Sequence, residues 1–592
     1  MHVTKDGGAS WQVISPDLTR NDTTHQQSSG GVTTDNLYTF DGATLFALAE
    51  SPVRAGVLWA GSNDGRVNVS MDGGVHWADV SGNIPKLSPW AKIVNIEPSR
   101  FDAGTAYLAA DLHELDDLDP YIFKTTDFGK TWKKISETFP RSPLSFVHIV
   151  REDPVRRGLL FAGTENGLYV TLDDGGSWLP LQTNLPHAPV SWLTVQPHFH
   201  DLVVSTYGRG IYILDDISPL EQLNGATLAS KATLFVPPQA YRLRDQQGVA
   251  SAPNSAVQPE NGPTGVPLTY YVSPALADTT TGSTAAPSTT CPNPQPPAPS
   301  PIDSSSRPRK PARLVVLDAQ GDTVRVLEGQ RQVGLNRVCW DLRYAAPATP
   351  KLRTPPPGKA FVRVGADGTR PLVTWDLDLS LRGPLVLPGT YTVRLVVADS
   401  ATASVTSTQS LTVLKDPNTT ATDADVQAQG KLARTIRAEQ DSIARMINRL
   451  EWVRKQVRDL TAQLRDSALA ADSGAKRMAA LADSLERRAI RVEGALFDVN
   501  LTGAREDAFR NPIQLYGRLA ALQSDMAENG ADFAPTTQQL AVHDVLAGRL
   551  AEATTRFADL MTKVIPQFVD ELRRTPLRDV LSTGSIGEGA RP

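Results

Sequence analysis

Cysteine, an excess of charge of one sign and long apolar runs are all scarce in this sequence. Only Cys291 and Cys339 occur among 592 residues, so the chain forms neither a disulfide-rich scaffold nor a four-cysteine zinc site. Whether the two cysteines form one disulfide is left open. The 59 Lys and Arg against 64 Asp and Glu leave a net charge of −5, without the basic excess that nucleic-acid binding requires. No run of about 18 apolar residues is present, so no membrane-spanning helix is expected.

The length predicts three or four domains, and 40% hydrophobic residues are enough to build their cores. The first residues, from Met1 to Asp6, lack the charged start, apolar stretch and cleavage site of a secretory signal. Because Thr4 already belongs to the repeat described next, we expect the chain to begin inside a domain. The missing signal therefore says nothing about export.

An eight-residue pattern, Ser/Thr-x-Asp-x-Gly-x-Ser/Thr-Trp, occurs four times, with only His76 departing from it. Its aspartates stand 66, 55 and 46 residues apart, at or above the roughly 40–50 residues of a four-stranded propeller blade. In such a turn the Asp carboxylate accepts backbone N–H groups, Gly adopts a positive φ, the hydroxyl closes the loop and Trp packs beneath it. We therefore predict structural roles for Asp6, Gly8, Trp11, Asp72, Gly74, Trp77, Asp127, Gly129, Trp132, Asp173, Gly175 and Trp178.

These turns resemble the Asp-box, or BNR, repeat of sialidases, xyloglucan-degrading glycosidases and sortilin-type receptor ectodomains. Residues 1–220 resemble the last blades of the large bacterial sortilin-like, glycosyl-hydrolase-like BNR propellers, including the closing stretch STYGRGIYILDDISPL at 205–220. The resemblance implies a β-propeller in which the Asp-box lies away from the ligand-binding face. It also implies a periplasmic or secreted full-length protein, although this chain carries no signal peptide.

The repeats divide residues 1–220 into a partial β-propeller of about four to five blades. We expect a tail from Thr4 to about Asp17, three complete units ending near Gly82, Phe139 and Pro186, and a three-stranded remainder at 190–216. An open propeller exposes edge strands. The chain is therefore expected to be N-terminally truncated and to self-associate through that edge or through the helical region.

The most acidic stretch, DLHELDDLD at 111–119, lies between two strands of one unit. Its hard oxygen ligands suit Ca²⁺, and the bacterial sortilin-like proteins carry a similar loop. The alternative is a solvated loop that binds nothing, and no other cofactor is indicated. The candidate metal ligands are Asp111, Glu114, Asp116, Asp117 and Asp119.

No local signature of a catalytic site is present. Glycoside hydrolysis needs two carboxyl groups across the sugar bond, but nothing places Asp64, Asp102, Glu165 or Asp201 on one face. His198 and His200 form either a two-histidine metal clamp or, as favoured, ordinary turn residues. Arg209 is expected to form a buried ion pair with Asp215 or Asp216.

Residues 221–415 are expected to form an immunoglobulin-like β-sandwich with a disordered Pro/Ser/Thr-rich insert at about 276–312. The segments at 334–344 and 383–397 resemble the Ig-like domains of flagellar hook-capping and bacterial secretion-associated proteins. That resemblance implies an accessory or docking module. Alternation from Tyr391 to Val397 predicts a half-buried strand, and Trp340 is expected in the core.

Residues 420–592 are predicted to be an antiparallel helical bundle. Ile436, Ile443, Leu450, Val457 and Leu464 repeat every seven residues in one long helix that begins near Asp423. We expect a second helix at about 475–499, a third from Pro512, and a fourth from Pro535 that Pro566 kinks or ends. The second helix should bury Leu481, and the fourth should turn Leu540 inward.

The fold class is thus multidomain, mainly β and then α. The sequence favours a non-catalytic sortilin-like binding protein for protein, peptide or glycan ligands in the extracellular space or periplasm. The competing hypothesis is a BNR-repeat glycoside hydrolase, sialidase-like or xyloglucanase-like, whose active site is completed by missing N-terminal blades. The catalytic residues of such an enzyme are unknown.

Overall fold

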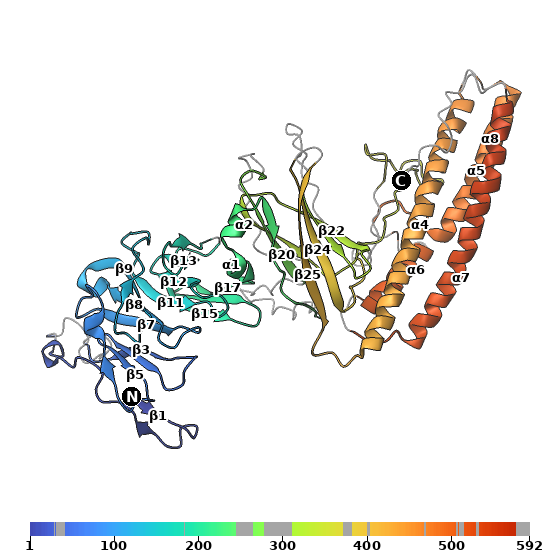
Figure 1. The fold of residues 1–592 in the computed structure, drawn as a ribbon. Helices are drawn as coiled ribbons and strands as arrows, with labels where there is room; N and C mark the ends of the chain where they lie inside the picture. The colour runs from blue at the N-terminus through green and yellow to red at the C-terminus, as the bar shows by residue number, and fades with distance from the viewer. Residues whose placement is uncertain are drawn as a thin grey trace. The chain divides into compact units, whose positions relative to one another are not determined.

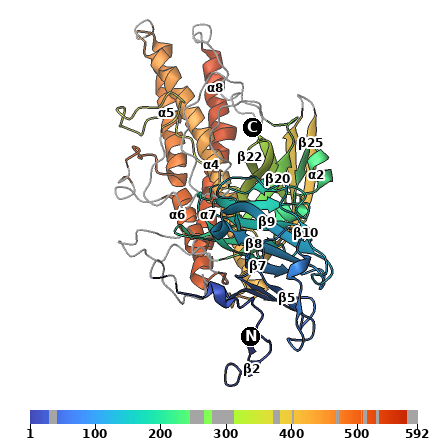
Figure 2. The same cartoon turned by 90° about the vertical axis from the view of Figure 1, so that its left-hand side faces the viewer.

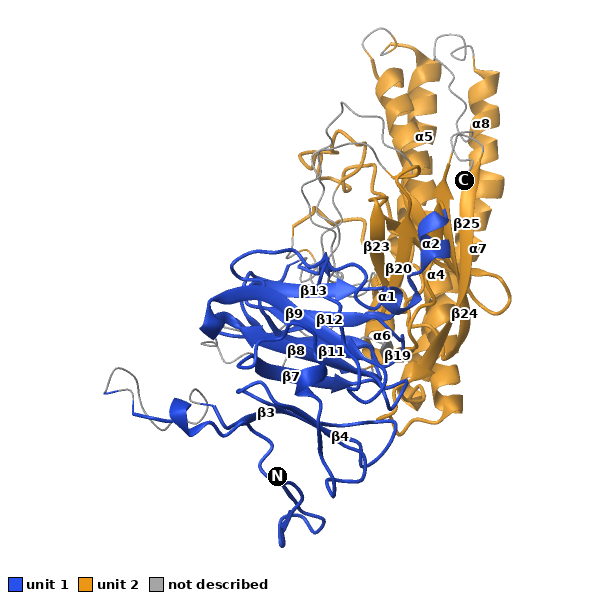
Figure 3. Cartoon of the chain, turned by 60° about the vertical axis from the view of Figure 1, so that its left-hand side comes forward, with its two compact units in different colours: residues 1–230, 279–287 blue, residues 231–278, 288–592 orange. Residues whose placement is uncertain are grey.

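The computed structural model describes most of the chain and divides it into two compact units. The described residues are 1–28, 30, 42–182, 184–243, 265–277, 311–370, 382–399, 403–466, 469, 471–504, 507, 514–527 and 532–575. Unit 1 comprises residues 1–230 and 279–287, and unit 2 comprises residues 231–278 and 288–592 (Figure 3). The expected three-domain scheme with its boundaries at 220 and 415 remains a prediction.

Unit 1 is built from antiparallel sheets whose strands follow one another in chain order (Figure 1). A two-stranded sheet comes first, followed by three four-stranded sheets and one three-stranded sheet. The strands are β1 (His2–Val3) and β2 (Gln12–Val13); β3 (Leu45–Glu50), β4 (Leu58–Ser62), β5 (Val67–Ser70) and β6 (Ala78–Asp79); β7 (Lys92–Pro98), β8 (Ala106–Leu112), β9 (Asp117–Thr125) and β10 (Lys133–Lys134); β11 (Val147–Glu152), β12 (Leu160–Thr164), β13 (Gly167–Thr171) and β14 (Leu179–Pro180); β15 (Val190–Gln196), β16 (Asp201–Thr206) and β17 (Gly210–Leu214). Helices α1 (Ser218–Gln222) and α2 (Gly225–Ala229) end the unit.

Successive sheets of unit 1 pack face to face, each junction around its own apolar core. Strand β7 packs on β3 and β4, β11 packs on β7 and β8, and β15 packs on β11 and β12. The three cores lie between the first and second, the second and third, and the third and fourth of the larger sheets. Their strands are nearly continuous apolar runs because both faces are covered.

Unit 2 begins with two sheets that share one core. The three-stranded sheet has the order β18 (Ala232–Leu234), β20 (Val266–Val272), β23 (Gly334–Trp340). The five-stranded sheet has the order β19 (Ala240–Arg242), β25 (Ser404–Lys415), β24 (Gly389–Ala398), β21 (Ala312–Leu317), β22 (Thr323–Gly329). Trp340 is fully buried against Tyr391, as expected. Cys339 is disulfide-bonded, whereas Cys291 and most of the predicted insert at 276–312 lie outside the described residues.

The helices of unit 2 share a second core. They are α4 (Asp423–Leu464), α5 (Ser473–Leu496), α6 (Leu515–Ala527), α7 (Thr537–Asp559), the π-turn η5 (Leu560–Val564) and α8 (Ile565–Arg574), with α5 alongside α4 (Figures 1 and 2). Thr422 and Thr536 cap α4 and α7 through capping boxes, which explains why these helices begin there. The predicted seam of α4 is buried throughout.

Two helical expectations differ from the structure, and one alternative of a third does. Leu540 is 46% exposed and Leu481 is 36% exposed, because α7 turns Leu546 and Ala553 inward and α5 turns Leu485 inward. Pro566, predicted to kink or end its helix, does not end it, because η5 and α8 follow α7 without a gap; the kink stays a prediction. The π-turn directly before it widens the backbone, and Pro566 then occupies the first turn of α8, where no intrahelical N–H donor is required. Pro512 lies outside the described residues.

A proline-rich strap, residues 345–359, runs along α4 in unit 2. Side chains on one face of α4 accept its backbone N–H groups: Ala348 N donates to Asp441 (2.6 Å), Lys351 N to Asn448 (2.6 Å), and Arg353 N to Glu451 (2.6 Å). Three strap residues in extended conformation match seven helical residues in length, because the rise per residue is about 3.3 Å against 1.5 Å. No motif or spacing in the sequence indicates this contact.

Candidate functional site

The four repeated turns share one hydrogen-bond pattern. The Thr or Ser hydroxyl that begins each turn accepts the N–H of the turn glycine, at 2.8 Å for Gly8, 2.9 Å for Gly74, 3.0 Å for Gly129 and 3.0 Å for Gly175. The Asp carboxylate accepts the backbone N–H four residues later at 2.8–2.9 Å. His76, the one departure from the pattern, replaces the usual hydroxyl contact with a ring nitrogen 2.7 Å from Asp72.

Hydrogen bonding lowers the pKa of all four aspartates. The Ser10 side chain lowers the pKa of Asp6 to about 2, and the His76 backbone N–H lowers that of Asp72 to about 2. For Asp127 and Asp173 burial is the largest single influence and raises the pKa, but the hydrogen bonds that each carboxylate accepts, including those from Thr131 and Ser177, together outweigh it. Groups held as carboxylates by their own turn are poor proton donors.

In the last three turns the tryptophan and a glycine reach the preceding sheet, a contact that no local motif indicates. Trp77 Nε1 donates to Ile14 O (2.9 Å), and Trp178 Nε1 donates to Ile135 O (2.8 Å). A Cβ on Gly175, whose φ is +88°, would lie 2.6 Å from Ile135 Cβ. The turn therefore joins the third and fourth strands of its own sheet and also holds the neighbouring sheet. Trp11, in the first turn, is 62% exposed, so the prediction that it packs beneath its turn is wrong.

The opposite end of these sheets carries a cluster of aromatic, histidine and acidic side chains. In each sheet the first strand begins at this end and the second strand turns into the third there, whereas the repeated turn connects the third strand to the fourth at the other end. We call the following residues the sheet-end cluster: Phe46, Lys92, Asp111, His113, Glu114, Phe146, His148 and Glu165. They come from three successive sheets and their connections.

Contacts link the sheet-end cluster into one row. Lys92 Nζ lies 4.6 Å from the Phe46 ring centre and 3.3 Å from Glu114. The His113 ring stacks on Phe146 at 4.8 Å, and Phe146 meets the His148 ring edge to face at 5.3 Å. His148 Nε2 lies 2.9 Å from Glu165, and His113 Nδ1 lies 2.7 Å from Asp111. Each carboxylate of the cluster thus pairs with a basic group.

The candidate metal ligands have separate partners. Asp111 contacts His113, Glu114 contacts Lys92, Asp117 accepts the Tyr121 hydroxyl (2.6 Å), and Asp119 pairs with Arg141 (3.1 Å). Asp116 ends a short 3₁₀ turn with a left-handed backbone (φ 59°). Within the described parts of the chain, no group of three or more His, Cys, Asp or Glu side chains is arranged to hold a metal ion. The geometry gives the calcium hypothesis no support.

The other carboxylates weighed in the sequence do not converge. Asp64 is buried and accepts Arg20 N (2.8 Å) and Ala43 N (3.1 Å), Asp102 accepts Gly104 N (2.7 Å), and Asp201 accepts Asp216 N (3.1 Å). Burial raises the pKa of Glu97, Asp153, Asp201 and Glu221, none of which belongs to the sheet-end cluster.

Two further expectations concern the closing stretch of unit 1. His200 pairs with Glu221 (2.8 Å), while His198 is exposed and packs edge to face on Phe199, so the two histidines do not share one partner. Arg209 is exposed in the turn between β16 and β17, so the expected burial is wrong. A residue in that solvent-facing turn has no sheet covering it.

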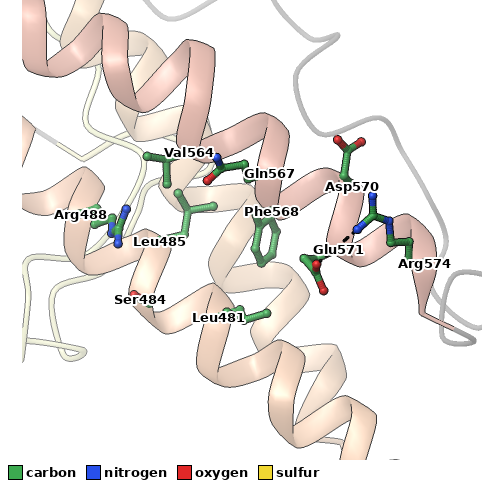
Figure 4. A pocket seen from close by; sticks show the side chains of 10 residues that line it. All are labelled: Leu481, Ser484, Leu485, Arg488, Val564, Gln567, Phe568, Asp570, Glu571 and Arg574. Atoms are coloured by element: carbon green, nitrogen blue, oxygen red, sulfur yellow. Dashed lines mark ion pairs between the residues drawn. The ribbon is translucent and has the colours of Figure 1, made fainter.

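Unit 2 contains a pocket of about 420 Å³ between α5 and the η5–α8 segment (Figure 4). Leu485 and Phe568 line it with apolar surface, and Arg488, Glu571 and Arg574 add charged groups. No helix of the described residues is long and apolar enough to span a membrane.

Comparisons with known proteins leave the family open. No protein-family model matches the chain, and no curated protein matches it in sequence, so neither comparison supports the resemblance to sortilin-like or BNR proteins. Solved structures that match part of it include YCF48, GH74 xyloglucanases and bacterial extracellular sensor domains, which are β-propeller-type folds. YCF48 from Cyanidioschyzon merolae is 18% identical, with 29% of this chain and 52% of that chain covered and a TM-score of 0.21.

Two further matches are equally distant. A GH74 xyloglucanase from Xanthomonas campestris is 15% identical over 45% of this chain and 38% of that chain, with a TM-score of 0.26. The extracellular domain of a putative hybrid two-component system from B. thetaiotaomicron is 10% identical over 63% and 38%, with a TM-score of 0.23. The chain therefore spans about half or less of these proteins. Because the TM-scores are this low, the likenesses carry no argument about function.

Proposed function

We propose that this chain is a non-catalytic binding protein whose ligand is a peptide segment of another protein, held at the sheet-end cluster. The observation that carries the proposal is the row of paired side chains from Phe46 to Glu165, drawn from three sheets at the end away from the repeated turns. It offers an apolar ring, two imidazoles and carboxylates within one surface. Such a mixture suits a peptide that carries apolar and basic side chains.

Glycan binding is less well supported by the same residues. Sugar rings stack on exposed aromatic faces, but Phe146 is only 7% exposed beneath His113, and Phe46 is 39% exposed. Hydrolysis of glycosides is also less well supported, since a general acid requires a raised pKa. The acids of unit 1 with raised pKa lie outside the cluster, and each carboxylate of the cluster has a basic partner.

The wider architecture belongs to the same proposal. The face-to-face sheets of unit 1 are interpreted as part of a β-propeller, with the repeated turns as structural Asp-boxes. In unit 2 the two sheets are interpreted as an Ig-like sandwich and the helices as an antiparallel bundle. The full-length protein is expected to be periplasmic or secreted, with the Ig-like and helical parts serving as docking modules.

A binding screen of the full chain against peptide and glycan arrays, together with aryl-glycoside turnover, tests the proposal. Phe46→Ala and Glu165→Gln should each weaken peptide binding by tenfold or more, because each removes a contact surface of the cluster. Val75→Ser is the matched control, since Val75 is 72% exposed in a repeated turn at the opposite end. Glycoside turnover, or glycan binding that survives Phe46→Ala, would contradict the proposal.

A further inference from the structure

The last sheet of unit 1 exposes a face that the other three large sheets bury. In each large sheet one residue of the first strand follows a β-bulge. In the first three sheets this residue is Ala47, Asn95 or Ile149, and its exposed fraction is 5%, 4% or 0%. In the last sheet it is Trp192, which is 51% exposed. The residue on the third strand in the same row of the sheet shows the same difference. Val67, Ile122 and Leu168 are at most 3% exposed, but Ile211 of the last sheet is 70% exposed.

A second row of the same face repeats the difference. Ile213 is 58% exposed, whereas Val69 and Val170, at the same register of the first and third large sheets, are 4% and 6% exposed; the second large sheet has the partly buried Lys124 there. Thr194 and Val203 complete this row across β15 and β16. The six central positions of the β15–β17 face are Trp192, Thr194, Val203, Ser205, Ile211 and Ile213, and none of them carries a charge.

In each of the other large sheets the equivalent face is covered by the next antiparallel sheet. The exposed β15–β17 face is therefore shaped to pack against another β-sheet. The first large sheet of a second copy offers only part of its own outer face. Its outer half is already covered by the chain itself, because Ile14 O and Leu18 O accept hydrogen bonds from Trp77 and Asn68. Its inner strand stays open, and Leu48 on that strand is 61% exposed. The β15–β17 face exposes side chains of its two outermost strands as well as its middle strand.

The six central side chains are uncharged, and Arg151, whose guanidinium lies 4.5 Å from the Trp192 ring centre, is paired with Glu97. The face can therefore meet its own copy without placing unpaired like charges together, and two-fold dimers are the commonest oligomers. Two aligned sheets pack face to face about 10 Å apart, with their side chains interdigitated. We propose that the β15–β17 face is a homodimer interface, in which the face of one chain packs on the same face of a second copy. The face is distinct from the sheet-end cluster, so dimerisation does not require ligand binding.

Sedimentation velocity of the full chain from about 1 to about 100 µM tests this proposal. We expect a concentration-dependent species of twice the chain mass of 63.9 kDa. Ile211→Lys and Ile213→Lys should each weaken dimerisation by at least tenfold, because each buries an unpaired ammonium in the interface. Both side chains are more than half exposed in the single chain, so thermal melting at low concentration should stay unchanged.

Leu48→Lys is the matched control, since it adds the same charge to the exposed side of the first large sheet. It should leave the dimer intact. A monomer at every concentration would overturn the proposal. A dimer that survives both isoleucine variants would place the interface elsewhere, including the helices of unit 2. Loss of the dimer in Leu48→Lys would instead show head-to-tail assembly and would equally overturn it.

Discussion

Two buried glutamates of unit 2 contact one arginine, and the structure predicts opposite consequences of replacing them. Arg454 Nη1 lies 2.9 Å from Glu451 and 2.8 Å from Glu493, and all three side chains are at most 1% exposed. Burial raises the pKa of Glu493 to about 8. Burial, together with the adjacent Glu451 carboxylate, outweighs the attraction of Arg454, so Glu493 binds a proton at neutral pH.

The pH dependence follows from the raised pKa. The stability that protonated Glu493 supplies is fully present below its unfolded value of 4.5 and is lost as the pH rises towards about 8. At 1.36 kcal/mol per pKa unit, the free energy of unfolding should fall by about 2 kcal/mol between pH 5.5 and pH 7.5 through this group alone. Glu493→Gln stays neutral at every pH. Its free energy of unfolding relative to the parent chain should therefore rise by about 2 kcal/mol over that range.

Glu451→Gln should instead destabilise unit 2 at every pH. Glu451 accepts Arg353 N (2.6 Å), Thr354 N (2.7 Å) and Thr354 Oγ1 (3.0 Å) as well as Arg454. A glutamine amide would place its own N–H donors against these donors, at a cost of about 3–5 kcal/mol.

Urea unfolding followed by far-UV circular dichroism at several pH values measures both effects. Glu552→Gln is the matched control, because Glu552 is 69% exposed on the same set of helices. Parallel pH profiles for Glu493→Gln and the parent chain would refute the assigned proton. Equal stability of Glu451→Gln and the parent chain at pH 7 would refute the role of the strap contact.

Three more predictions concern unit 1. Gly175→Ala should lower stability by about 2 kcal/mol more than Gly73→Ala, because both have positive φ but only Gly175 would clash with Ile135 of the preceding sheet; equal melting temperatures would contradict the inter-sheet contact. Asp173→Ala should cost about 1–3 kcal/mol, because one N–H group and two hydroxyls lose their acceptor, and unchanged urea unfolding would show that the turn holds without it. Melting in calcium and in chelator should coincide, because the acids of the loop at 111–119 have separate partners; a calcium-dependent shift would revive the metal site.

The repeated turns were predictable because their hydrogen bonds join residues two to four positions apart. The carboxylate, glycine and hydroxyl of each turn are contiguous in sequence, so local geometry alone specifies their contacts. The same holds for the starts of α4 and α7, where Thr422 and Thr536 cap residues within one turn of themselves. The seven-residue repeat of α4 likewise predicted its buried seam.

The sheet-end cluster could not be predicted in this way. Phe46, Lys92 and Glu165 stand scattered over 120 residues, and no spacing rule relates them. One feature of the sequence could have indicated the cluster. Each of these residues lies at a strand start or in a strand-to-strand turn, at the same end of its sheet. His113 and Glu114 were singled out only as parts of an acidic loop. Their neighbours Phe146 and His148 come from the next sheet.

The sequence by itself determined the strand-turn units of unit 1 and the helix starts of unit 2, because these depend on contacts within one turn or one strand pair. Tertiary structure alone decided what those elements touch. Trp178 bonds to Ile135, and the strap lies on α4 through Glu451, because packing brings together backbone groups that are 43 and 98 residues apart. Such contacts depend on how finished elements stack, and burial, more than local sequence, selects their partners.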